Sequence, residues 1–313
     1  MRVSSNSFTN DFLTQINQLQ QQQITLQQES ASGLKVTLPE NNPAVMTNVL
    51  NLQTASSESS QYQNNVASLQ NSATTSYDAM NSLKTISDQV NEIAIEASSG
   101  TTSSSQLSAY STQVSQLIQQ ALQIANTQNA DGNYIFGGTE TNKQPFTATT
   151  AANGSVTSVA YNGNSSVASA EIAPHTTVSA QTPGENNSGS GPQGLFADSR
   201  TGADFFSHLI SLQQDLASGN TSAISSTDAP ALQKDETNII TSISANSVMQ
   251  ATLTNATNIA TAQSTNLATQ ISNDTSANLA TTMTQLNQTQ TAYQAALESG
   301  SMIFNTSLLN YLK

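Results

Sequence analysis

The sequence predicts a mainly α-helical protein: an elongated rod of long antiparallel or coiled-coil helices formed by both chain ends, with a small inserted β module. Heptad-spaced apolar residues near the two ends predict the helices. Turn signals between residues 131 and 199 predict the β module. Only 36% of the 313 residues are hydrophobic and 5% are aromatic, so we expect slender elements with narrow apolar stripes.

A first helix is predicted from about residue 7 to residue 32. Phe12, Leu19 and Leu26 fall seven residues apart, and Phe8 and Ile16 occupy the second apolar position of the same heptads. Glutamine fills most of the other faces. Such a helix needs a partner helix to cover its stripe, because isolated helices are marginal in water.

Breaker residues divide the following segment into two further helices. Gly33 and Pro43 mark a predicted bend, and apolar spacing of three and four residues then continues from 44 to 98. Residues 99–105 interrupt the spacing, which resumes from 107 to 125. The short connection predicts that these two helices are antiparallel neighbours.

Turn signals then replace the helical spacing. Three dipeptides favour tight turns: Asp131-Gly132, Asn153-Gly154 and Asn162-Gly163. We therefore expect a β-hairpin near residues 131–141 and a small β module at 142–199. Helical spacing returns at Thr201, which is predicted to open a helix that closes near Gly219.

The last segment carries a second heptad seam. One position of the repeat holds Leu279, Leu286 and Tyr293, and the other holds Met283, Gln290, Leu297 and Phe304. Leu308, Leu309 and Leu312 add apolar side chains beyond the seam. A pair of helices hides only one stripe on each, so we expect part of this surface to pack against other chains.

The predicted organisation has three domains. Residues 1–35 and 273–313 form an innermost terminal coiled coil, residues 36–141 and 200–272 form a helical rod domain, and residues 142–199 form the outer β module. The predicted assembly interface consists of the terminal seams, namely Phe8, Phe12, Ile16, Leu19, Leu26, Leu279, Met283, Leu286, Tyr293, Leu297, Phe304, Leu308, Leu309 and Leu312.

Composition argues against an enzyme and against several kinds of partner. The net charge is −13, and the seven basic residues are scattered, so we expect neither nucleic acid nor membrane as a partner. His175 and His208 are the only histidines and there is no cysteine, so no catalytic, metal or cofactor site is predicted. The N-terminus lacks the pattern of a signal peptide, so an extracellular location requires another export route.

Five segments in the same order along the chain resemble the flagellin-like family, and within it the hook-filament junction proteins. They are MRVSSNSF, SASGLKVTLPENNP, ANTQNADGNYIFGGTETNKQPF, TGADFFSHLISL and YQAALESGSMIFNTSLLNYL. The resemblance covers nearly the whole chain except the middle. It implies a structural adapter in which the paired terminal helices surround a central export channel and the β module faces outward.

The resemblance also implies partners and a location. The partners are hook-associated protein 1, flagellin, copies of the chain itself in a ring or helical layer, and a cytoplasmic export chaperone that holds the C-terminal region. Export runs unfolded through the flagellar type III apparatus to the extracellular hook-filament junction. A chain without cysteine suits that passage. Two alternatives stay open: a minor flagellin that forms filament, and more remotely an adhesin or enzyme carried in the β module.

Overall fold

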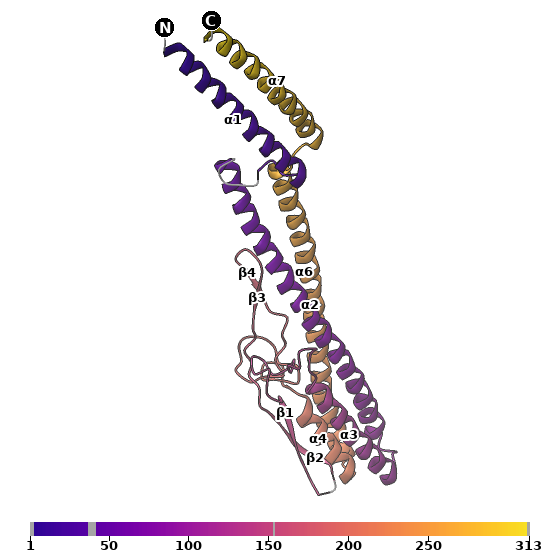
Figure 1. Ribbon diagram of the computed structural model, residues 1–313. Helices are drawn as coiled ribbons and strands as arrows, with labels where there is room; N and C mark the ends of the chain where they lie inside the picture. The colour runs from indigo at the N-terminus through magenta and orange to yellow at the C-terminus, as the bar shows by residue number, and fades with distance from the viewer. Residues whose placement is uncertain (1–2, 37–41, 153, 312–313) are drawn as a thin grey trace. The chain divides into compact units, whose positions relative to one another are not determined.

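The computed structural model describes residues 3–36, 42–152 and 154–311, and the predicted mainly α-helical class is confirmed (Figure 1). Its contacts divide the chain into two compact units. The terminal unit comprises residues 1–58 and 263–313, and the central unit comprises residues 59–262. Among the described helices, none combines the length and the apolar character needed to cross a membrane.

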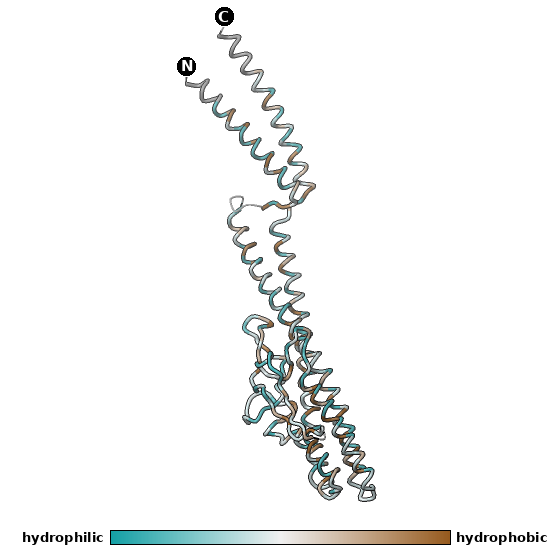
Figure 2. The backbone as a smooth tube through the Cα atoms, turned by 60° about the horizontal axis from the view of Figure 1, so that its bottom comes forward, coloured by the Kyte–Doolittle hydropathy of each residue, from teal (hydrophilic) through white to brown (hydrophobic). Residues whose placement is uncertain are grey.

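The terminal unit is built on two long helices from opposite ends of the chain, α1 (Val3–Ser32) and α7 (Leu279–Tyr311). Figure 1 shows them side by side and antiparallel, with both chain ends at the same end of the pair. The unit also holds the first part of α2 (Pro43–Ser98) and the last part of α6 (Ala229–Thr275). Hydrophobic and hydrophilic positions alternate along these helices, as Figure 2 shows.

Backbone hydrogen bonds tie the residues just after α1 to the end of α6 and to the segment that leads into α7. Gly33 adopts a φ of 72°, which turns the chain out of α1 at a position that favours glycine. The Lys35 amide then donates to the Thr275 carbonyl at 2.7 Å, and the Ala277 amide donates to the Gly33 carbonyl at 2.8 Å. These crossing bonds fix which residues of α1 face which residues of α7.

In the central unit, α3 (Ser104–Ala125), α4 (Phe205–Ser218) and α6 pack with α2 around an apolar core. The start of α3 is fixed by a capping box, in which Ser103 and Gln106 each bond the other's backbone amide. Between α4 and α6 lie the short helix α5 (Thr221–Ala223) and the π-helix η1 (Ile224–Asp228).

Helix α4 begins later than the sequence predicts. Thr201 does not open it, because its hydroxyl bonds the Asp198 carbonyl at 3.2 Å and Asn238 at 3.2 Å. Residues Ala203–Asp204 form strand β7, and the Asp204 carboxylate caps α4 by accepting the Ser207 amide. The end of the helix agrees with the sequence, since Gly219 has a φ of 74°.

Three small sheets lie between α3 and α4. Strands β1 (Phe146–Thr150) and β2 (Val156–Tyr161) are antiparallel, as are β3 (Ala170–Ala173) and β4 (Thr176–Val178). In the third sheet, β6 (Ala197–Asp198) pairs in parallel with β5 (Glu185–Asn186) and antiparallel with β7. Near Asp131-Gly132, where the sequence indicates a hairpin, the described backbone forms turns and one bridge between Gln128 and Tyr134.

A cluster of aromatic rings joins these sheets to the helices. The Phe196 ring lies 4.9 Å from that of Phe146 and 5.3 Å from that of Phe206, measured between centroids. It also meets the edges of the Phe136 and Phe205 rings. Because Phe196 is only 1% exposed, its removal would leave a cavity at the junction of β1, β6 and α4.

We expect Phe196→Ala to lower the free energy of unfolding of the central unit by about 3–5 kcal/mol, from lost burial and the cavity left behind. Urea titration followed by circular dichroism measures this change. The control is Ile95→Ala, whose side chain is 67% exposed and should cost no more than about 0.5 kcal/mol. Equal effects of the two substitutions would contradict the placement of Phe196 at the centre of the core.

Candidate functional site

The described part of the terminal unit offers an extended surface along α1 and α7 as its candidate site. Six predicted interface residues are partly buried there: Phe12, Ile16, Leu19 and Leu26 on α1, and Leu286 and Tyr293 on α7. On α1, Gln23 continues the same partly buried stripe at heptad spacing. The structure therefore brings these two stripes together between the helices.

Three other predicted residues do not enter the seam. Leu279, Met283 and Leu297 remain 50%, 52% and 46% exposed. In the second stripe of α7, Thr282 lies inward in place of Met283, because it is only 4% exposed. Gly300, which continues the stripe of Leu286 and Tyr293, is also buried. Heptad counting along α7 thus located one stripe of the seam and placed the other one residue too late, because it selected the largest side chains at that spacing.

The close contact between Gly300 and Phe12 explains why a glycine lies inward at position 300. A Cβ atom on Gly300 would lie 2.6 Å from Cε1 of the Phe12 ring, which is less than carbon atoms tolerate. The ring therefore occupies the space that a larger residue on α7 would need. The sequence signal was the glycine itself, which stands at the heptad position following Leu286 and Tyr293.

The remaining predicted interface residues lie at the chain ends. The side chains of Phe8, Phe304, Leu308 and Leu309 and the whole of Leu312 fall outside the described part of the structure. Their role in assembly stays a prediction.

The two sides of the α1–α7 pair differ in chemistry. With about 3.6 residues per turn, Leu13 and Ile24 project to one side of α1, and Leu279, Met283 and Leu297 project to the same side of the pair from α7. We call this exposed set the apolar flank; Leu13 is 50% and Ile24 is 41% exposed. One contact crosses its edge, where the Ser30 hydroxyl donates to the Met283 sulfur at 3.3 Å.

The opposite side of the pair is polar. A groove there is lined by Gln21, Gln22, Thr25, Leu26, Gln285, Gln288 and Thr289. We call it the glutamine groove. Its amides supply both donors and acceptors, so it suits a polar neighbour better than an apolar one.

Few charges interrupt either side. The only charged residues within α1 are Asp11 and Glu29, and Glu298 is the only one within α7. Burying this surface against another chain would therefore desolvate few charged groups, which is the largest cost of closing a polar interface.

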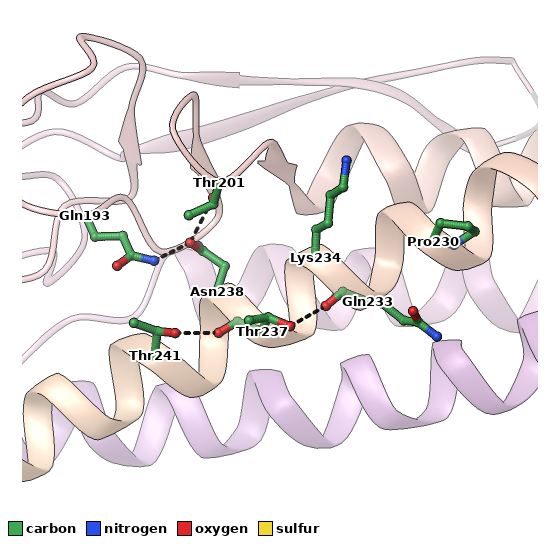
Figure 3. A pocket seen from close by; sticks show the side chains of 8 residues that line it. All are labelled: Gln193, Thr201, Pro230, Gln233, Lys234, Thr237, Asn238 and Thr241. Carbon is green, nitrogen blue, oxygen red and sulfur yellow. Dashed lines mark hydrogen bonds between the residues drawn. The ribbon is translucent and has the colours of Figure 1, made fainter.

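The central unit contains an open hollow of about 480 Å³ beside α6, shown in Figure 3. Its polar groups are largely used within the chain: Gln193 and Thr201 donate to Asn238 Oδ1, whose Nδ2 donates to the carbonyls of Gly194 and Leu195 at 2.8 Å. Lys234 is the only charged residue in its lining. The hollow thus presents one ammonium group among neutral side chains.

The two histidines lie in different surroundings. His208 Nδ1 is 2.7 Å from Asp235 Oδ2, and this hydrogen bond raises the pKa of His208. His175 occupies the β3–β4 turn with a φ of 60°, and its amide donates to Glu171. Within the described residues, no group of three or more His, Cys, Asp or Glu side chains is placed to hold a metal ion.

We expect Gly300→Leu to weaken the α1–α7 pairing, because the new side chain and the Phe12 ring need the same space. Phe12→Ala should also weaken it, through lost burial. The double variant should recover part of the loss, since the leucine then fills the volume that the ring leaves. Amide hydrogen exchange of α1 and α7 measures the effect, with Ser299→Leu as the exposed control. Purely additive losses in the double variant would contradict direct packing of these two residues.

The comparisons with known proteins agree with this architecture. Residues 3–141 match the family model of the bacterial flagellin N-terminal helical region. No curated protein matches the sequence. Among solved structures, a flagellar hook-associated protein from Vibrio parahaemolyticus superposes with a TM-score of 0.63 at 16% identity, over 75% of this chain and 100% of that one.

Two further structures are similar. FlgL from Bacillus cereus gives a TM-score of 0.55 at 16% identity, covering 71% of this chain and 99% of its own. FlgL from Xanthomonas campestris gives 0.55 at 14% identity, covering 69% and 99%. The chain therefore shares the fold of flagellar hook-associated proteins, and its residues 3–141 carry the bacterial flagellin N-terminal helical region.

Proposed function

We propose that this protein is a non-enzymatic structural adapter of the bacterial flagellum, which joins the hook to the flagellin filament. The observation that carries the proposal is the α1–α7 pair, which presents an apolar flank on one side and the glutamine groove on the other. The fold shared with flagellar hook-associated proteins supports the same conclusion.

Two unlike sides suit an adapter because they favour head-to-tail packing. A surface that binds its own copy symmetrically must be self-complementary, whereas unlike surfaces generate rings or helical layers. Leu279, Met283 and Leu297 require an apolar neighbour, and Gln285 and Gln288 on the opposite side require a polar one. We infer that copies of this chain form such a layer, with hook-associated protein 1 on one side of it and flagellin on the other.

The shallow seam supports assembly coupled to folding. Phe12, Leu19 and Leu286 are only partly buried in a single chain, so the pair gains much of its burial when neighbours arrive. A chain of this kind stays unfolded more readily before assembly. That property fits export of the unfolded chain by the flagellar type III apparatus. It also fits a cytoplasmic chaperone that holds the C-terminal region before export.

The direct test is a bacterial strain that lacks the gene. Without the adapter, flagellin should be shed into the medium and hooks should carry no filament, and the restored gene should return attached filaments in electron micrographs. Normal filament attachment in the deletion strain would contradict the proposal. The match to the flagellin region also fits a minor flagellin, and long filaments grown from the purified protein alone would favour that function.

The apolar flank yields a sharper test. We expect Leu279→Gln with Leu297→Gln to leave the α1–α7 pair folded, because both side chains are about half exposed, and to abolish filament attachment. Circular dichroism measures the first outcome, and counts of attached filaments measure the second. The matched control is Thr291→Gln, on the exposed outer face of α7, which should behave as wild type. An equal defect in the control would contradict the assignment of the flank.

A further inference from the structure

A buried carboxylate lies where α4, η1 and α6 meet. Asp228 ends the π-helix η1 and is only 1% exposed. Its Oδ1 accepts the Ser211 hydroxyl of α4 at 2.8 Å. Its Oδ2 is buried and has no hydrogen-bond partner among the described residues. A buried ionised carboxylate with one unpaired oxygen is costly, so this corner favours the protonated form.

The groups around Asp228 act on it in opposite ways. Asp215 of α4, one turn beyond Ser211, repels its negative charge, and His208 of α4, one turn before Ser211, attracts it. Burial has the largest effect, and it raises the pKa of Asp228 to about 6. Asp228 therefore loses its proton between mildly acidic and neutral pH.

The histidine beside it belongs to a second chain of contacts. His208 Nδ1 lies 2.7 Å from Asp235 Oδ2 of α6, and Asp235 Oδ1 accepts the Asp204 amide of β7 at 2.8 Å. Asp204 also attracts the His208 charge and Lys234 of α6 opposes it. The corner thus gathers ionisable groups from α4, η1, α6 and β7 around two buried carboxylates.

The π-helix makes the corner sensitive to such a change. A π-helical turn lacks the regular bonds to the fourth preceding residue, so it depends on tertiary contacts for its stability. The Ser211–Asp228 hydrogen bond is one such contact, together with the buried Ile224 side chain at the start of η1. Charging Asp228 beside Asp215 weakens the contact between α4 and η1.

We propose that this corner is a proton-operated latch, in which Asp228 holds one proton beside Asp215 and the loss of that proton loosens η1 from α4. The latch is closed at mildly acidic pH and weakened at alkaline pH. It is a conformational device of the central unit and is independent of the proposed role of the terminal helices.

The direction of the pH dependence follows from the sign of each shift. Asp228 has a pKa raised in the folded state, so its stabilisation is complete below the unfolded value near 4 and is lost as the pH rises through about 6. His208, with a raised pKa, contributes in the same direction at higher pH. Burial likewise raises the pKa of Glu185 in β5 to about 7, beside Asp204. Loss of a proton from each of these three groups lowers the stability of the folded central unit as the pH rises.

The test measures the unfolding equilibrium of the full chain by urea titration at pH 5 and pH 8. In wild type, titration of Asp228 should raise the unfolding constant about tenfold between these values. Asp228→Asn keeps the shape of the side chain and carries no charge. Its unfolding constant should therefore not show this tenfold rise, and the variant should be more stable than wild type at pH 8. Asp78→Asn, an exposed carboxylate of α2, is the matched control and should keep the wild-type dependence.

A second variant and a direct measurement complete the test. Ser211→Ala removes the hydroxyl that donates to Asp228 Oδ1 and lowers the pKa of Asp228, so it should steepen the pH dependence. Carboxyl carbon NMR of wild type reads the titration of Asp228 even if a variant fails to fold, and hydrogen exchange of residues 219–230 should speed up above pH 6 beyond the intrinsic rate. An unchanged dependence in Asp228→Asn, or a carboxyl pKa near 4, would overturn the proposal.

Discussion

Scarcity of apolar side chains is the constraint on which the rest of the structure depends. Only 36% of the residues are hydrophobic, so each long helix carries a narrow stripe that must meet a partner. The polar faces are satisfied locally, because many serine and threonine hydroxyls bond the carbonyl four residues earlier, as Thr54 and Thr241 do. Helix pairing is therefore the main source of stability, and an unpaired stripe such as the apolar flank marks a place for another chain.

The fold could be predicted from the sequence where local chemistry decides the outcome. The stripes and breakers located α1, α2 and α3 within a few residues, and Gly219 located the end of α4. The errors arose where distant residues compete. Thr201 does not open α4, because its hydroxyl forms a hydrogen bond with Asn238, 37 residues away. The parallel pairing of β5 with β6 likewise joins segments without a periodic pattern, so no spacing indicates it.

The candidate site could be predicted only in part, for a geometric reason. A heptad pattern identifies which residues share a side of one helix, but the partner decides which neighbouring position turns inward. On α7, Thr282 lies inward while the neighbouring Met283 stays half exposed, and the Phe12 ring leaves room only for a glycine at position 300. The His208–Asp235 pair could not be predicted from the sequence either, because its two residues lie 27 positions apart on different helices.

The α1–α7 pair carries few charges. Fourteen of the 20 acidic residues lie between residues 59 and 262, whereas α1 and α7 together hold three. The helices with the exposed apolar flank can therefore approach neighbours at little electrostatic cost. In the central unit, by contrast, Asp228 lies near Asp215 and Glu185 lies near Asp204. Its stability consequently responds to pH, while pairing of the nearly uncharged terminal helices responds chiefly to apolar contact.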